Sequence, residues 1–352
     1  MNINEVKLYN DDLKETASLN LDWNKLKDKT FLITGATGLI GKYLIDLIMY
    51  KNDAENLNCK IIALGRNESK AKERFSNCFN NSLFKFYEAD IDKEIIIDEE
   101  KVDFILHAAS STHPLQYSNY PISTITANVI GTKNILDLAV KTNTTRVVFA
   151  SSVEIYGENR GDVDAFDESY LGYINCNTLR AGYPESKRTG EALCQAYIKE
   201  KGLDVVIPRL SRIFGPTILS TDSKALSQFI NKAVNDEDIV LKSEGTQYYS
   251  YTYVADAVSA ILCILFNGEN GEAYNISDSS YDITLRDLAS LIAKHVNRKV
   301  VFDLPSEEER KGYSTATKAI MNSSKIKELG WKVTNPLEVT LNRTIKILRE
   351  IK

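Results

Sequence analysis

Short apolar runs alternate with helical patterns through the first two-thirds of the chain. The runs predict strands at residues 30–34, 60–64, 84–87, 102–107, 146–150 and 204–208. The helical patterns between them lie at residues 41–50, 68–75, 123–141 and 183–201. Strands whose cores are continuous apolar runs, alternating with helices, are typical of a parallel sheet covered on both faces. The pattern therefore predicts an α/β fold with a doubly wound parallel sheet over residues 30–210.

The pattern changes after Pro216, where the segments become more polar. We expect a smaller mixed α/β substrate lobe built from residues 211–249 and 276–352, with the chain returning to the main sheet near 250–275. Its expected elements are helices at 223–235 and 285–295 and short strands at 239–242 and 299–302. Residues 1–29 lack the basic start and apolar block of a targeting peptide, and we expect an ordered extension with a short helix.

Composition narrows the class of protein. The hydrophobic fraction of 43% allows a sizeable core, and the net charge of -5 argues against a nucleic-acid partner. No apolar run reaches the ~18 residues that a membrane span needs. The five cysteines are scattered without a C-x-x-C pair, so we expect reduced thiols in a cytoplasmic protein. The three histidines lack metal-ligand spacing, and no metal is expected.

A glycine-rich loop, Thr34-Gly-Ala-Thr-Gly-Leu-Ile-Gly41, joins the first strand to the first helix. Its glycines allow a tight turn, close approach of a pyrophosphate and close helix packing, while the helix N-terminus offers N–H donors to the anion. Packing alone is the alternative explanation. The loop predicts a Rossmann-type dinucleotide site whose residues are Gly35, Thr37, Gly38, Leu39, Ile40 and Gly41.

The choice between NAD and NADP depends on the end of the second strand. There the chain reads Leu64-Gly65-Arg66-Asn67, without the acid that usually holds the adenosine ribose. Arg66 could bind a 2′-phosphate and favour NADP, or it could be a solvated arginine. Asp90, after the third strand, is a candidate for the adenine edge, with a surface-turn acid as the alternative.

Tyr183 and Lys187 are four residues apart, so they share one face of the predicted helix. A neighbouring ammonium is expected to lower the pKa of the phenol. A tyrosine tuned in this way can take a proton from a substrate hydroxyl. The pair, with Ser152 upstream, predicts oxidation of an alcohol to a ketone.

With these elements in place, the chain resembles the extended short-chain dehydrogenase/reductase family over about residues 30–331. It is most similar to the nucleotide-sugar epimerase/dehydratase branch, and closest in motif to UDP-glucuronate decarboxylase. The matching motifs are Thr34–Gly41, His107–Ala109, Asn128–Thr132, Ser151–Gly157, Tyr183–Lys187, Phe214–Pro216, Tyr253–Asp256 and Leu329–Trp331.

The resemblance implies a tightly bound NAD or NADP that takes hydride from C4 of a nucleotide-linked sugar. Tyr183 would take the hydroxyl proton, Ser152 would bind the same oxygen, and Lys187 would hold the nicotinamide ribose. Helices 123–141 and 183–201 resemble those of a four-helix homodimer interface. The further cofactor contacts implied are Asp90, Ile91, Ala108, Ala109 and Asn128.

The residues after Ser152 bear on the step that follows ketone formation. Glucose-type dehydratases of this family carry Asp then Glu. Decarboxylases and mannose-type dehydratases carry Ser then Glu, and simple epimerases generally lack the Glu. This chain has Val153 then Glu154, so it lacks the acid of dehydration and retains a base. Glu154 therefore favours chemistry at C5 or C6, with a solvated loop carboxylate as the alternative.

The substrate-binding positions depart from the decarboxylase pattern. Arg212 replaces an Asn, Tyr249 replaces an Arg, and Lys318 matches an Arg. We hypothesise that Arg212 binds the diphosphate; an Arg paired to a carboxylate, with no ligand role, is the alternative. The departures leave a CDP- or GDP-linked sugar open beside UDP-glucuronate. The substrate candidates are Ser110, Arg180, Arg212, Gln247, Tyr249 and Lys318.

Tyrosines 248, 249, 251 and 253 could flank a nucleobase or sugar, although their spacing fits a half-exposed strand better. The function predicted is oxidation at C4 followed by decarboxylation of a nucleotide-linked uronate. The alternatives are a 4,6-dehydratase, a C4 or C5 epimerase, an NADPH-dependent keto-sugar reductase, and a catalytically silent nucleotide-binding regulator.

Overall fold

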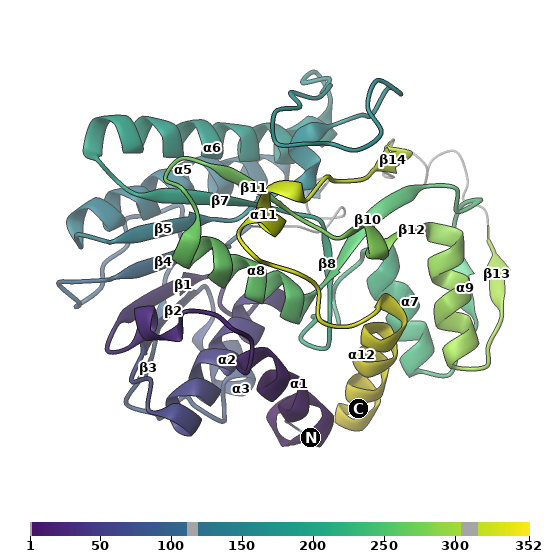
Figure 1. Ribbon diagram of the computed structural model, residues 1–352, viewed down its shortest axis with the longest axis horizontal. Coiled ribbons are helices and arrows are strands. Elements are labelled where there is room, and N and C mark those ends of the chain that lie inside the picture. The colour runs from purple at the N-terminus through teal and green to yellow at the C-terminus, as the bar shows by residue number, and fades with distance from the viewer. Residues whose placement is uncertain (1, 111–118, 304–315) are drawn as a thin grey trace.

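The main sheet has eight strands in parallel pairing (Figure 1). In this computed structural model, the structure describes residues 2–110, 119–303 and 316–352. The strand order is β11-β7-β5-β4-β1-β2-β3, with β6 paired to β7. The strands are β1 Thr30–Thr34, β2 Lys60–Gly65, β3 Phe84–Glu88, β4 Phe104–His107, β5 Arg146–Phe149, β6 Ser151–Ser152, β7 Val205–Leu210 and β11 Ala273–Ile276.

Helices cover both faces of this sheet, as the apolar strands predict. On one face Phe31 and Ile33 pack in a core with α2 and α8; on the other Leu32 packs in a core with α5. Alternate residues of β1 are therefore buried on opposite faces, and the predicted doubly wound Rossmann-type fold is confirmed. The helices are α2 Leu39–Glu55, α3 Glu68–Arg74, α5 Pro121–Lys141, α6 Gly182–Lys201 and α8 Val254–Asn267.

The later part of the chain forms a second, smaller group of elements. A four-stranded sheet has the order β12-β10-β14, with β8 paired to β10, and β9 pairs with β13. The chain returns to the main sheet through α8 and β11, which pairs with β7. The elements are β8 Arg212–Phe214, α7 Ala225–Val234, β9 Ile239–Leu241, β10 Tyr248–Tyr253, β12 Asp282–Thr284, α9 Leu285–His295, β13 Val300–Phe302, β14 Lys318–Ala319, α11 Ser324–Glu328 and α12 Leu337–Ile351.

Strand β10 differs from the expected half-exposed strand. Tyr249, Tyr251 and Tyr253 are buried, and Ser250 and Thr252 between them are buried as well. The alternation of Tyr with small polar residues was a misleading guide, because both faces of β10 are covered and its polar side chains find partners inside the protein. The Ser250 hydroxyl, for example, donates to Asp282 at 2.5 Å.

The N-terminal extension is ordered and contains the predicted short helix, α1 Lys7–Ala17. Asp12 of α1 is buried, and its Oδ2 accepts hydrogen bonds from Tyr253 at 2.7 Å and Tyr43 at 3.1 Å. Arg343 of α12 pairs with the same carboxylate. Figure 1 shows both termini at the lower end of the molecule, where α1 contacts α12. Asp12 thus joins α2, β10 and the last helix.

Among the described helices, none is long and apolar enough to cross a membrane.

Candidate active site

The glycine loop connects the end of β1 to the start of α2. Gly35 has φ +67°, and a Cβ there would lie 2.7 Å from the Ala108 carbonyl oxygen. A Cβ on Gly41 would lie 2.6 Å from the Gly35 carbonyl oxygen. Gly38 is the N-cap of α2, and no side chain of the described residues caps this helix. The free backbone donors and the absence of Cβ atoms fit the pyrophosphate of a dinucleotide.

The loop is fastened to the end of β4. The Thr34 hydroxyl oxygen accepts hydrogen bonds from the backbone N–H groups of Ala108 and Ala109, both at 3.1 Å. His107 Nδ1 lies 2.8 Å from the same oxygen, and its Nε2 lies 3.2 Å from Thr132 Oγ1. Burial lowers the pKa of His107 to about 3. His107 is therefore a neutral core residue that orders the cofactor end of the sheet.

The predicted adenosine contacts lie at the ends of β2 and β3. Arg66 is exposed after β2, and Asp90 is exposed in the turn after β3. The Ile91 side chain belongs to the core, where a Cβ on Gly131 of α5 would meet it at 2.7 Å. Thr37, Leu39 and Ile40 are partly buried in the glycine loop and the first turn of α2. The roles of these residues in cofactor binding stay predictions.

Tyr183 and Lys187 are both buried on the first turns of α6. Lys187 Nζ donates to the Ala150 carbonyl oxygen at 2.8 Å, and burial lowers the pKa of Lys187 to about 8. The expected lowering of the Tyr183 pKa by Lys187 is wrong in this structure. Burial raises the pKa of Tyr183 to about 12, while hydrogen bonds with Ser152 and Ser110 lower it. The Tyr183, Ser152 and Ser110 hydroxyl groups thus lie together in the structure.

A chain of hydrogen bonds links α5 to the start of α6. The Ser110 hydroxyl donates to Asn128 Oδ1 at 2.7 Å, and Asn128 Nδ2 donates to the Ser186 oxygen at 2.8 Å. The Ser186 hydroxyl in turn donates to the Tyr183 carbonyl oxygen at 2.8 Å. Asn128 is buried, so it orients Ser110 and the backbone of Tyr183. Sequence reasoning missed Ser186, although its position between Tyr183 and Lys187 on the same helix was a usable signal.

Glu154 lies between two arginines that come from different parts of the chain. Its Oε2 is 3.4 Å from Arg180, and its Oε1 is 3.6 Å from Arg212. Glu154 is in the short 3-10 helix Val153–Tyr156, directly after Ser152 at the end of β6. Arg180 precedes α6 and Arg212 begins β8. Arg212 is thus paired to a carboxylate, the arrangement that the sequence left open beside a diphosphate role.

Arg212 also covers the ring of Tyr249. Its guanidinium carbon lies 3.6 Å from the ring centroid, and the Tyr249 hydroxyl donates to the Ala316 carbonyl oxygen at 2.7 Å. The Nη1 atom of Arg212 is buried and has no hydrogen-bond partner within the described residues. Tyr249 therefore serves as a platform for Arg212 in this structure, and its contact with substrate stays a prediction.

Gln247 and Lys318 lie further along the lobe sheet. Gln247 Oε1 accepts from the Ser243 hydroxyl at 3.3 Å. Lys318 of β14 pairs in register with Tyr248, and its Nζ is 3.7 Å from Asp164. These contacts do not place either residue on Glu154 or Tyr183, so their substrate roles stay predictions.

The arrangement has the chemistry of a dehydrogenase site. The glycine loop follows the carboxyl end of β1, Ala108 follows that of β4, and Ser152 is the last residue of β6. Open parallel sheets bind their ligands at this edge. The Tyr183 phenol lies beside the Ser152 hydroxyl there, the Lys187 ammonium is one helical turn further along α6, and a carboxylate is two residues from the serine. Together they can move a proton at an alcohol oxygen and at a neighbouring carbon.

Comparison with known proteins places the chain among NAD dependent nucleotide-sugar enzymes. The sequence model described as the NAD dependent epimerase/dehydratase family matches residues 31–277. The chain is 29% identical over 322 residues to UDP-glucuronic acid decarboxylase 1 of Xenopus tropicalis, covering 92% of this chain and 72% of the relative. It is 29% identical over 306 residues to UDP-glucuronic acid decarboxylase 5 of Arabidopsis thaliana, covering 86% and 84%.

Solved structures share the fold at lower identity. A dTDP-glucose 4,6-dehydratase of Streptomyces venezuelae with NAD bound superposes with a TM-score of 0.76 at 23% identity, over 91% of this chain and 97% of the other. A UDP-glucuronic acid 4-epimerase of Bacillus cereus with NAD bound gives 0.77 at 22%, over 92% and 100%. These findings confirm the resemblance predicted from the motifs. The chain belongs to the NAD dependent epimerase/dehydratase family.

Proposed function

We propose that this protein oxidises the C4 hydroxyl of a nucleotide-linked uronate with bound NAD(P) and then removes the C5 carboxylate as carbon dioxide. The observation that carries the proposal is the position of Glu154. It keeps a carboxylate beside Ser152 and next to two arginines, in a chain similar to UDP-glucuronic acid decarboxylases. A simple epimerase has no need of that carboxylate.

The backbone of the glycine loop and the N-terminus of α2 would hold the pyrophosphate, and Lys187 would reach the nicotinamide ribose. When bound, the nicotinamide supplies the hydride acceptor. The family is NAD dependent, and the exposed Arg66 with no acid at the end of β2 leaves room for a 2′-phosphate.

Tyr183 takes the proton of the C4 hydroxyl on its phenolic oxygen. Burial keeps the free phenol protonated at neutral pH. The phenol can therefore serve as the base only when hydrogen bonds and positive charge stabilise the phenolate. Ser152 supplies a hydrogen bond, and Lys187 is the buried cation one helical turn away. Ser152 is also placed to bind the C4 oxygen as the ketone forms.

Decarboxylation follows from the ketone at C4. The bond between C5 and the carboxylate carbon breaks, and its electron pair moves to C5 and the C4 oxygen as an enolate. A proton must then return to C5. Glu154, beside Ser152, can deliver this proton once its carboxylate has taken one up from solvent. Val153, in the place where glucose-type dehydratases carry an acid, cannot protonate a departing C6 hydroxyl, which weighs against dehydration.

A panel of nucleotide sugars tests the proposal. Purified protein with NAD or NADP is incubated with neutral and uronate forms of UDP-, GDP- and CDP-linked sugars, and the products are followed by mass spectrometry. Loss of carbon dioxide from a uronate supports the proposal. Loss of water identifies a dehydratase, and unchanged mass with altered stereochemistry identifies an epimerase. Stoichiometric consumption of NADPH identifies a reductase.

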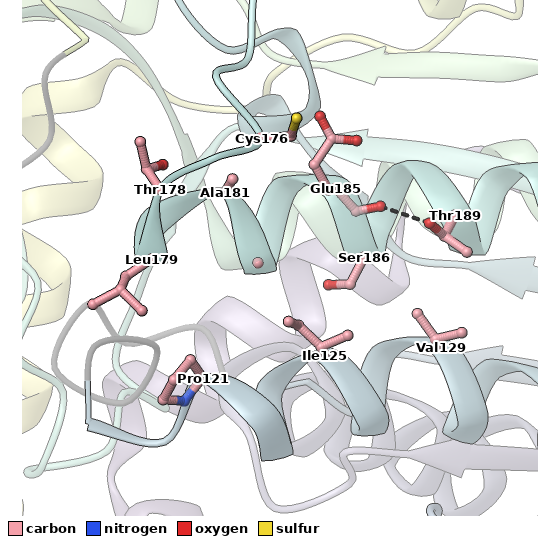
Figure 2. A pocket seen from close by; sticks show the side chains of 11 residues that line it. Pro121, Ile125, Val129, Cys176, Thr178, Leu179, Ala181, Glu185, Ser186 and Thr189 are labelled. Carbon is pink, nitrogen blue, oxygen red and sulfur yellow. Dashed lines mark hydrogen bonds between the residues drawn. The ribbon is translucent and has the colours of Figure 1, made fainter.

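We further propose that the protein forms a homodimer through α5 and α6. These two helices pack against each other, and apolar side chains on α5 and just before α6 are exposed: Ile122 is 78% and Leu179 is 72% exposed. Figure 2 shows the open groove between the helices, with Pro121, Ile125 and Val129 of α5 facing the start of α6. A second copy of the same helix pair would bury this surface in a four-helix bundle.

The cysteines support a cytoplasmic location. All five are free thiols, and four of them are buried. Unpaired buried thiols are usual in reducing compartments.

A further inference from the structure

The carboxylate of Glu154 occupies a site made by Arg180 and Arg212. Both ion pairs are long, at 3.4 and 3.6 Å, compared with ~2.7–2.9 Å for a close charge-assisted hydrogen bond. The Glu154 side chain is 27% exposed, and those of Arg180 and Arg212 are 31% and 21% exposed. The carboxylate is therefore held loosely, at a place that solvent reaches.

Arg212 has unused capacity to bind an anion. Its face is stacked on Tyr249, which leaves the edge of the guanidinium for hydrogen bonds. The Nη2 atom of Arg212 forms the ion pair with Glu154. Its Nη1 atom is buried and has no hydrogen-bond partner within the described part of the chain. A buried donor without an acceptor is unfavourable, and a ligand carboxylate that accepted from it would relieve this.

We propose that Arg180 and Arg212 form a carboxylate subsite in which Glu154 stands in for the carboxylate of the substrate sugar. On binding, the carboxylate at C5 takes the place of Glu154 on the two guanidinium groups. Glu154 is released toward Ser152 and the reacting carbon. The ligand class is a nucleotide sugar whose sugar bears a carboxylate. Arg212 is then the residue that selects uronates over neutral sugars.

This subsite deepens the proposed function and rests on it for the nucleotide-sugar ligand. It differs from the role first considered for Arg212, which was contact with the diphosphate. The two roles make different predictions. If Arg212 binds the diphosphate, it contributes equally to the binding of uronate and neutral nucleotide sugars, because both carry the diphosphate. If Arg212 binds the carboxylate, it contributes only to the binding of the uronate.

Calorimetry with matched ligands tests the subsite. The Tyr183→Phe protein, loaded with NAD so that turnover is blocked, is titrated with UDP-glucuronate and UDP-glucose, and in parallel with GDP-mannuronate and GDP-mannose. We expect at least ~10-fold preference for the uronate in the series whose nucleotide binds. Adding Arg212→Met should remove that preference and leave the neutral sugar unchanged. Adding Glu154→Gln should increase the affinity for the uronate several-fold and leave the affinity for the neutral sugar unchanged. The reason is that the side chain at position 154, which competes with the substrate carboxylate for the two arginines, loses its charge.

Arg160 provides a matched control. It also stacks on a tyrosine, with its guanidinium carbon 4.4 Å from the Tyr173 ring centroid, and it pairs with Glu158 at 3.6 Å. Arg160→Met should leave the uronate preference intact. If Arg212→Met does not fold, as judged by circular dichroism, the Glu154→Gln titration decides the question by itself.

Three results would overturn the subsite: no uronate preference in either nucleotide series, equal weakening of both ligands by Arg212→Met, or no tightening by Glu154→Gln. Failure of the proposed function looks different. A protein that prefers uronates but releases no carbon dioxide keeps the subsite and loses the decarboxylation.

Discussion

Lys187 Nζ donates a hydrogen bond to the carbonyl oxygen of Ala150 at 2.8 Å. Ala150 directly follows β5, so this bond fastens the first turns of α6 to the carboxyl end of the sheet. Tyr183, one turn before Lys187, is thereby held beside Ser152 and Ser110. The bond fixes the distance between the helix that carries the base and the strands that carry the cofactor loop.

Replacing Tyr183 with Phe should reduce turnover by about 100- to 10,000-fold, because the phenolic oxygen that takes the C4 proton is removed. Cofactor affinity should change little, since the ring and its packing remain. Turnover and NAD binding are measured separately, by product formation and by calorimetry. Tyr197→Phe, on the same helix with its hydroxyl on Asp137, is the control and should keep normal turnover. Normal turnover in Tyr183→Phe would exclude Tyr183 as the base.

Gly35→Ala should weaken NAD binding by at least ~10-fold and lower stability. The new Cβ would meet the Ala108 carbonyl at 2.7 Å, in a residue with φ +67°. Gly202 is the matched control, since it has φ +70° but open space around its Cβ position. Gly202→Ala should cost only the left-handed strain of ~1–2 kcal/mol and leave NAD binding unchanged. Equal NAD affinity in the two variants, measured by calorimetry, would show that the Gly35 turn is not part of the cofactor site.

Asp256→Asn should stabilise the protein increasingly as pH rises. Asp256 is fully buried; its Oδ1 accepts from the Thr334 N–H and hydroxyl at 2.9 Å, and its Oδ2 is buried without a partner within the described residues. Burial raises the pKa of Asp256 from 3.8 to about 7. The folded state therefore keeps a proton that the unfolded chain has lost, and the Asp256 contribution to stability falls between about pH 4 and pH 7 and is constant above.

The measurement is the melting temperature of both proteins across this range. The advantage of the asparagine should widen up to about pH 7 and then stay level. Asp167→Asn is the control, because the hydrogen bond from Ser169 lowers the pKa of Asp167 below 3.8. Its effect on stability should be constant above about pH 5. A pH-independent difference for Asp256→Asn would mean that Asp256 does not titrate in this range.

Ile122→Glu should turn the dimer into a monomer. The proposal places this exposed side chain in the apolar interface, where an unpaired charge costs several kcal/mol, so self-association should weaken by at least ~100-fold. Sedimentation equilibrium measures the mass. Ile96 is 70% exposed and lies outside the two helices, so Ile96→Glu should remain a dimer. A monomeric wild-type protein would refute the proposed interface.

The sequence predicted the main sheet well because its strands are buried on both faces. Runs such as Thr30–Thr34 have a continuous apolar core, here Phe-Leu-Ile, which is not typical of surface segments. The Tyr183–Lys187 pair was also readable, since helical spacing alone puts the two side chains on one face. The contact of Glu154 with Arg180 and Arg212 was not readable, because separate crossovers of the chain bring these residues together. The Tyr183 pKa was misjudged because burial raises it, and the charge of Glu154 raises it further.

The central claim is that the ketone at C4 serves to release the carboxylate at C5. The most direct test uses UDP-glucuronate labelled isotopically at the carboxylate carbon, together with its GDP-linked counterpart, and measures labelled carbon dioxide against nucleotide-sugar product. The account predicts one labelled carbon dioxide for each pentose-type product from at least one of the two substrates, with none from Tyr183→Phe. Conversion of either uronate to a product that retains the label would contradict it.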